Sequence, residues 1–176
     1  RKRRIYARGA ENFTIPYLTN WLGYVNMDIK KYLNVLNKKE QSAILKLVDK
    51  KLTRIPNGPG LQTHPNIHLC KELKPLVAKL KEYITRNFTI DRCWANHTDG
   101  AYINWHKHKA DLSVVYYLKN KESLGTIFLV GDKIIRPKFP ENSLIIFKHE
   151  IHSVPPRKKG TSKINRYSVA LDISFY

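Results

Sequence analysis

The segment INRYSVALDISF (residues 164–175) alternates in size and polarity with a period of two. Successive side chains of a β-strand point to opposite faces, so the segment predicts a strand with two unlike faces. One face is bulky and consists of Asn165, Tyr167, Val169, Leu171, Ile173 and Phe175; the other is small and polar and consists of Arg166, Ser168, Ala170, Asp172 and Ser174. We expect the bulky face to pack against helices. The polar face either lines a pocket that contains one arginine or faces solvent at a sheet edge.

Two amphipathic helices are predicted before this strand, over about 38–53 and 72–87. Asn37 and Glu40 have the spacing of a capping box, and apolar residues follow at helical spacing. The breaker PNGPG (56–60) then ends the first helix. Pro75 fits the second helix because it falls in the first turn, where no backbone N–H is needed.

From residue 90 onward, short β-branched and aromatic runs alternate with turn residues. The predicted strands cover 90–96, 101–106, 112–118, 125–131, 133–137, 143–148 and 164–175. Many short strands at this spacing are typical of a sandwich or barrel. Helices followed by strands predict an α+β, mainly β protein. We expect one domain over 1–176, with a basic arm and supporting helices in 1–89 and the β core in 90–176.

The net charge is strongly positive, with 32 Lys+Arg against 14 Asp+Glu and a balance of +18. Such a charge favours polyanionic partners and argues against sites built from several carboxylates, such as two-metal nucleases. The segment RKRRIYAR (1–8) is a basic arm that fits a tail, a phosphate-contacting segment or an edge strand equally well. No apolar stretch reaches the length of a membrane span, so we expect a soluble, cytoplasmic protein without membrane partners.

The two cysteines, Cys70 and Cys93, lack the spacing of a metal site. We expect two thiols in a reducing compartment, with a disulfide as the alternative.

A second informative segment is NWHKHKADLSVVYYL (104–118). In a strand, His106 and His108 point to the same side and Lys107 points away. Two imidazoles on one side can bind Fe(II), Zn(II) or Mn(II). A third ligand must come from elsewhere, and His149, Glu150 and His152 follow the apolar run 143–148. Taken alone, the pair is equally compatible with two surface histidines among lysines.

The order of these parts is more specific than any one of them. A strand with His-x-His is followed by an apolar strand ending in YYL, a Gly-bearing hairpin, another strand, HSVPP (152–156), and Arg-x-Ser on the last strand. This order resembles the Fe(II)/2-oxoglutarate-dependent oxygenases, in particular the prolyl-hydroxylase-like branch with its short phage and bacterial members. The resemblance covers roughly residues 90–176. It implies a double-stranded β-helix, which is a jelly-roll or cupin-like barrel, and leaves a phage origin open.

By this resemblance, the iron ligands are His106, His108 and His152. The co-substrate 2-oxoglutarate is bound by Arg166, with Ser168 and Tyr117 assisting.

The sequence departs from the family at the middle ligand, where most members have Asp and this chain has His108. A carboxylate offsets one charge of Fe(II), whereas three neutral imidazoles offset none. His108 is therefore the expected third ligand, with Asp111 as a substitute and an altered or lost metal site as the remaining alternative.

Other residues are candidates for the wall of the pocket. By the two-residue period, Trp94, Asn96, Tyr102 and Asn104 share the side of His106. Core packing is an equal alternative for the two aromatic residues. His149 and Glu150 are not expected to be ligands, although Glu150 is placed to hydrogen-bond an imidazole. No motif surrounds His64, His68 or His97.

The resemblance implies a dioxygenase (hydroxylase) that uses Fe(II), 2-oxoglutarate and O2. The candidate site is flanked by Lys107, Lys109 and the basic run 157–163, which favours an acidic macromolecule as the substrate. A protein, modified on prolyl or other side chains, is favoured over a nucleic acid. The alternative is a nucleic-acid-binding or structural protein with a vestigial barrel.

Overall fold

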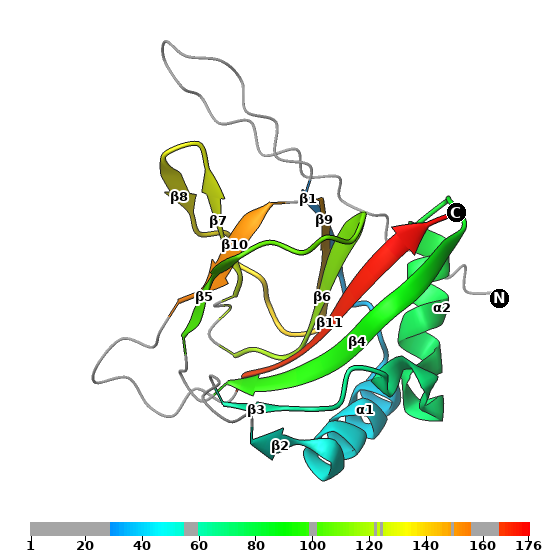
Figure 1. The fold of residues 1–176 in the computed structure, drawn as a ribbon. Coiled ribbons are helices and arrows are strands. Elements are labelled where there is room, and N and C mark those ends of the chain that lie inside the picture. Colours follow the sequence, from blue (N-terminus) through cyan, green and yellow to red (C-terminus); the bar gives the residue numbers. More distant parts are fainter. Residues whose placement is uncertain are drawn as a thin grey trace, which may run out of the picture.

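The computed structural model describes residues 29–54, 60–98, 102–121, 123, 125–148, 150–155 and 166–176. These residues form two antiparallel β-sheets, with two helices behind the larger sheet (Figure 1). The basic segments 1–8 and 157–163 lie outside the described residues. No helix in the described part of the chain combines the length and apolar character needed to cross a membrane.

The larger sheet has seven strands, and every pairing within it is antiparallel. In spatial order they are β1 (Ile29–Leu33), β9 (Ser143–Phe147), β6 (Leu112–Lys119), β11 (Arg166–Phe175), β4 (Phe88–Thr98), β3 (Leu61–Gln62) and β2 (Thr53–Arg54). Three of them, β1 to β3, were not predicted, because each is too short or too rich in polar residues to show a period of two.

The smaller sheet has four strands, β5 (Ile103–His106), β10 (Ile151–Val154), β7 (Ile127–Val130) and β8 (Lys133–Ile135), in that spatial order. His152 pairs with His106, but Val154 pairs with Ile103. Between these two pairs β5 has one residue more than β10, which is a β-bulge. This irregularity decides which side chains of β5 face inward.

Both predicted helices are present, and the second has different boundaries from those predicted. In α1 (Lys38–Lys51), both bonds of the capping box between Asn37 and Glu40 are present. α2 (Lys74–Tyr83) is shorter than predicted, and two 3-10 turns precede it, η1 (Ile67–Leu69) and η2 (Lys71–Leu73). It ends at Tyr83 because Ile84 becomes extended and buries its side chain in the core.

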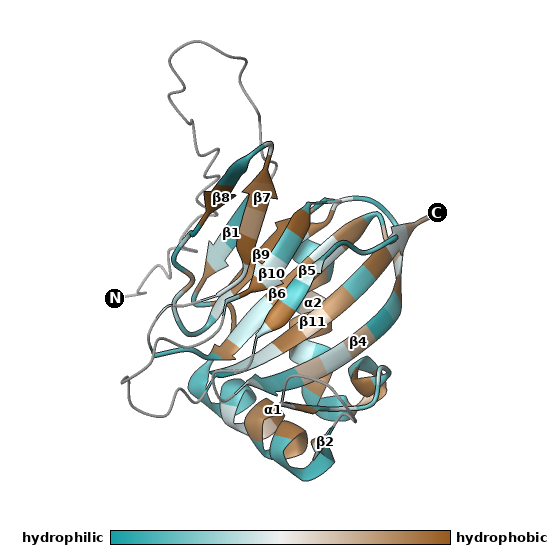
Figure 2. Cartoon of the chain, turned by 60° about the vertical axis from the view of Figure 1, so that its left-hand side comes forward, coloured by the Kyte–Doolittle hydropathy of each residue, from teal (hydrophilic) through white to brown (hydrophobic). Residues whose placement is uncertain are grey.

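The last strand, β11, has the two faces that its sequence predicts, and Figure 2 shows similar alternation on its neighbours. The bulky residues from Tyr167 to Ile173 belong to a core that includes apolar residues of α1 and α2. Phe175 packs at the margin of this core, and Asn165 lies outside the described residues. The polar face points to the opposite side, toward the smaller sheet.

A second apolar cluster lies between the sheets and includes Tyr117, Phe128, Phe139, Ile145 and Phe147. The structure therefore confirms a mainly β fold of two facing sheets with supporting helices. Both cysteines are free thiols, as predicted, and burial raises the pKa of Cys93 to about 12.

Candidate active site

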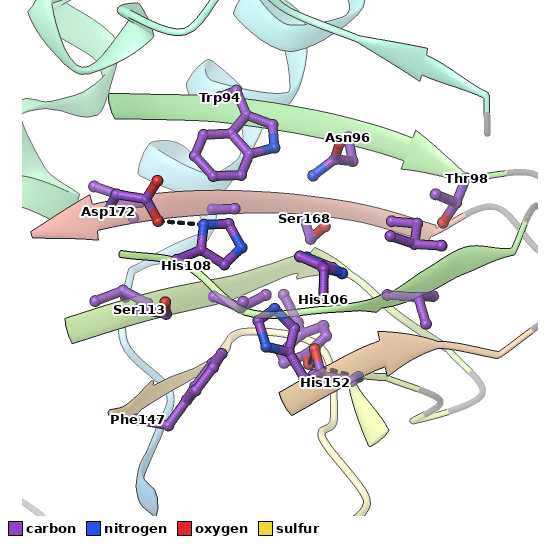
Figure 3. Close-up of a pocket in the computed structure, with 18 of the residues that line it drawn as sticks. Trp94, Asn96, Thr98, His106, His108, Ser113, Phe147, His152, Ser168 and Asp172 are labelled. Carbon is purple, nitrogen blue, oxygen red and sulfur yellow. Dashed lines mark hydrogen bonds and ion pairs between the residues drawn. The ribbon is translucent and has the colours of Figure 1, made fainter. Parts of the chain in front are cut away.

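A pocket of about 220 Å³ opens between the two sheets (Figure 3). Its wall combines side chains of β4, β6, β9 and β11 from the larger sheet with side chains of β5 and β10 from the smaller one. Polar groups gather at two places in it: three histidines, two on the smaller sheet and His108 just beyond β5, and a buried arginine on β11.

His106 and His152 face each other across the β5–β10 pair, and their ring centroids are 4.3 Å apart. The Nδ1 atom of His106 lies 2.7 Å from the carbonyl oxygen of Asn104, and Nδ1 of His152 lies 2.8 Å from the carbonyl oxygen of Glu150. A carbonyl oxygen only accepts, so each Nδ1 carries the hydrogen. In both rings Nε2 is then the nitrogen with a free lone pair, which is the form that binds a metal.

In His108 the Nδ1 atom faces a carboxylate instead of a backbone carbonyl. Its Nδ1 lies 2.7 Å from Oδ1 of Asp172, which comes from β11 on the opposite sheet (Figure 3). The indole of Trp94 stacks beside the His108 ring with 5.8 Å between centroids and 18° between planes. The carboxylate and the indole together fix the orientation of this imidazole.

The three histidines converge closely enough to share an ion. One ring nitrogen from each lies within 4.8 Å of the other two. Nitrogens bound to one ion at about 2.1 Å are at most about 4.2 Å apart, so small side-chain rotations complete such a set. The residues present therefore fit a divalent transition metal.

Burial favours the neutral form of two of these imidazoles. The pKa of His152 is lowered to about 4, chiefly by burial, and the neighbouring imidazoles of His106 and His108 act in the same direction. Burial also lowers the pKa of His106, and His108 acts in the same direction. The neutral imidazole is the ligand form, so these two rings are ready to bind a metal near pH 7.

Arg166 provides a positive charge inside the same pocket. Its side chain is buried, its Nε donates to Oγ1 of Thr98 at 2.9 Å, and burial lowers its pKa. Among the described residues, no carboxylate lies within ion-pair distance of it. A buried guanidinium without a carboxylate partner is suited to an anionic ligand, which it can bind through two parallel hydrogen bonds.

Tyr117 lies in this region, but its hydroxyl group is already engaged. It donates to Oγ1 of Thr126 at 2.9 Å and accepts from the Thr126 backbone N–H at 3.0 Å. A ligand would therefore meet the Thr126 hydroxyl as a donor, since Tyr117 has no second hydrogen. Gly125 permits this arrangement, because a Cβ there would lie 2.7 Å from the Tyr117 oxygen.

The other predicted residues divide into two groups. Asn96 and Ser168 line the pocket, as does Trp94, and Asn96 accepts a hydrogen bond from Gln62 at 2.9 Å. Tyr102 and Asn104 do not line it: both are exposed, and Ile103 takes the inward position. The β5 bulge explains the difference, because one extra residue inverts the alternation upstream of His106.

Asp111 is not brought to the histidines. Its carboxylate accepts the backbone N–H of Phe175 at 2.8 Å, and it does not belong to the cluster. Glu150 meets His152 through its backbone carbonyl.

Asp172, Thr98 and Thr126 have contacts in the pocket that were not predicted. The signal for Asp172 was present, because it shares the polar face of the last strand with Arg166 and Ser168. Thr98 lies directly opposite Arg166 on β4, a pairing that only the sheet register reveals. Nothing in the local sequence distinguishes Thr126.

Comparison with solved structures identifies the fold. HygX from Streptomyces hygroscopicus, with nickel, 2-oxoglutarate and hygromycin B bound, superposes with a TM-score of 0.65 at 7% identity, over 84% of this chain and 83% of that one. A prolyl hydroxylase from Trichoplax adhaerens, in complex with a hypoxia inducible factor peptide, gives 0.64 at 15% identity and 83% coverage of both chains. The viral collagen prolyl hydroxylase of Paramecium Bursaria Chlorella virus-1, as a 2-oxoglutarate complex, gives 0.60 at 14% identity, over 82% and 94%.

No protein-family model matches the sequence, and no curated protein matches it. At identities this low the structural likeness concerns the fold, and it confirms the fold that the sequence resemblance implies. The chain has the double-stranded β-helix fold of the 2-oxoglutarate/Fe(II) oxygenases.

Proposed function

We propose that this protein is an Fe(II)- and 2-oxoglutarate-dependent dioxygenase with His106, His108 and His152 as its metal ligands. One observation carries the proposal: a single pocket contains three convergent imidazoles and a buried arginine that has no carboxylate partner among the described residues. This combination suits a metal ion and a dicarboxylate that bind together. We take the whole chain, 1–176, as one domain in this proposal.

Each residue then has a defined task. The three imidazoles hold the metal, and Arg166 pairs with the far carboxylate of 2-oxoglutarate, assisted by the hydroxyl groups of Thr126 and Ser168. The bound metal supplies the activation of O2. Phe147, whose ring centroid lies 4.9 Å from that of His152, forms an apolar wall beside the metal ligands. No side chain needs to act as a general acid or base.

We propose an acidic macromolecule, most simply a protein or peptide, as the prime substrate. Arg92, whose side chain is 60% exposed, extends from Asp172 toward solvent, and Lys107 and Lys109 are exposed beside the metal ligands. These cations surround the site with positive charge, which attracts acidic chains. The Trichoplax prolyl hydroxylase, which has this fold, is solved in complex with a peptide, and this supports a peptide substrate.

The proposal is tested with purified protein under anaerobic conditions. Fe(II) plus 2-oxoglutarate should give a weak visible charge-transfer band, and admitting O2 should convert 2-oxoglutarate to succinate. Both signals should disappear in His106→Ala and persist in His64→Ala, which changes an exposed histidine outside the pocket.

Absence of both the band and 2-oxoglutarate consumption in the unmodified protein would refute this function. RNA or DNA binding that weakens steeply with salt and is unaffected by His106→Ala would instead support the nucleic-acid-binding alternative.

A further inference from the structure

Asp172 is the carboxylate nearest to the histidine cluster, and its two oxygens have different partners. Oδ1 lies 2.7 Å from Nδ1 of His108, and Oδ2 lies 3.0 Å from an Arg92 guanidinium nitrogen and accepts from Arg92 Nε at 3.2 Å. The Asp172 side chain is 3% exposed. Burying a carboxylate is costly unless its partners stabilise the charge, so its placement behind His108 requires an explanation.

The charge of the metal site provides that explanation. Three neutral imidazoles bring no negative charge to a divalent cation. Asp172 adds one negative charge, at the edge of the His108 ring where Nδ1 lies. Arg92 does not cancel it fully, because the arginine side chain is largely exposed and its charge is screened by water.

The strands also hold Asp172 firmly in this position. On β11 it pairs with Ser113 of β6 on one side and with Arg92 of β4 on the other, near the centre of the larger sheet. His108 is thus fixed from the opposite sheet, whereas His106 and His152 are fixed by carbonyl groups two residues away in their own chain segments.

We infer that Asp172 is a positioning residue of the metal site: it fixes the tautomer and orientation of His108 and supplies the negative charge that a carboxylate ligand would otherwise bring. The inference rests on the proposed function only in taking His108 as a metal ligand. Carboxylates that hydrogen-bond metal-binding histidines raise the basicity of the ligand, and their loss usually weakens metal binding about 10–100-fold.

The experiment measures the affinity of the metal-free protein for Co(II) by calorimetry and by the cobalt absorption bands, without 2-oxoglutarate. Asp172→Asn should weaken Co(II) binding about 10–100-fold. Asp111→Asn is the matched control, because Asp111 is also a partly buried carboxylate that accepts a hydrogen bond, in that case from Phe175 of β11. This control should leave the affinity unchanged.

A double-mutant cycle separates the effect of the carboxylate charge on Co(II) affinity from any effect of the substitution on folding. In His108→Asp the new carboxylate lies near Asp172, and the two like charges should oppose each other. The double variant His108→Asp/Asp172→Asn moves the carboxylate from position 172 to position 108. It should bind Co(II) more tightly than either single variant, and this comparison decides the question even if Asp172→Asn alone folds poorly.

A second readout does not depend on metal. In the metal-free protein, nitrogen NMR of the His108 ring should show hydrogen on Nδ1, and Asp172→Asn should weaken the downfield shift of that hydrogen. A folded Asp172→Asn protein that binds Co(II) as tightly as the unmodified protein overturns the inference. If Co(II) binds through the three histidines but 2-oxoglutarate is not consumed, the proposed activity fails, and the titrations still decide the role of Asp172.

Discussion

At the scale of single residues, the three pocket histidines share one feature: the Nδ1 atom of each lies within 2.8 Å of a fixed oxygen. Two of these oxygens are backbone carbonyls two residues earlier in the chain, and the third belongs to Asp172. The rings are therefore oriented before any metal arrives, which lowers the entropy cost of binding. The sequence indicated which histidines converge, but the partner of His108 depends on the position of the opposite sheet.

The buried imidazole of His152 makes the stability of the metal-free protein depend on pH. Its pKa is about 4 in the fold and about 6.5 when unfolded. Below about pH 6.5 the unfolded chain binds a proton that the folded chain does not bind until about pH 4. Stability is therefore constant above about pH 7 and falls on acidification. For His152 alone, the free energy of unfolding should drop by about 2 kcal/mol between pH 7 and pH 5.

Urea denaturation in the presence of a chelator measures this dependence. His152→Gln should flatten the profile over this interval, since glutamine does not titrate, while His106 leaves a smaller slope of the same sign. An unchanged profile in His152→Gln would show that His152 is not held neutral by burial.

At the scale of secondary-structure elements, the long regular segments were predictable and the short ones were not. β11 and α1 carry their period over ten or more residues, and their faces agree with the prediction, while β6 was predicted from its continuous apolar run. β1, β2 and β3 have too few residues to show one, and they exist because neighbouring strands pair with them. Tyr102 and Asn104 were placed wrongly because the β5 bulge depends on the pairing with β10.

Asn142 connects the approach to α1 with the start of β9. Its backbone is left-handed, with φ at +61°. Its side chain accepts from the Leu36 N–H at 3.0 Å and from the Tyr116 hydroxyl at 2.9 Å, and it donates to the Leu36 carbonyl at 2.8 Å. Asn142→Gly keeps this backbone conformation accessible but removes three hydrogen bonds. The free energy of unfolding should fall by about 2–3 kcal/mol in urea denaturation.

Asn142→Asp is the conservative comparison. It retains the accepting oxygen and loses only the donor to Leu36, so it should cost less than the glycine variant. Equal losses in the two variants would indicate that the two hydrogen bonds accepted by Asn142 contribute little.

At the scale of the whole molecule, the proposed ligands divide between the two sheets. The histidines belong to the smaller sheet and its extension, whereas Arg166 belongs to β11 of the larger one. A metal-bound 2-oxoglutarate would therefore join the sheets, and any ligand selective for the folded state raises its stability. Mn(II) alone should raise Tm, and adding 2-oxoglutarate should raise it further.

Arg166→Ala distinguishes these two increments. The variant should retain the increase due to Mn(II) and lose the increase due to 2-oxoglutarate, with 2-oxoglutarate affinity reduced about 30-fold or more, since a desolvated charged pair contributes at least about 2 kcal/mol. Retention of the second increment would mean that another group binds the far carboxylate. Differential scanning fluorimetry with Mn(II), which does not support turnover, is sufficient.

The position of Cys93 has a consequence for the durability of the protein if it activates oxygen as proposed. Cys93 precedes Trp94 on β4, so its side chain points away from the pocket into the helix-side core, with no exposed surface. Its high pKa keeps it protonated, and the thiol form is slow to oxidise. Among the described residues that line the pocket there is no sulfur atom. If the proposed enzyme oxidised its own side chains during uncoupled turnover, aromatic rings in the pocket, such as that of Trp94, would therefore be oxidised first.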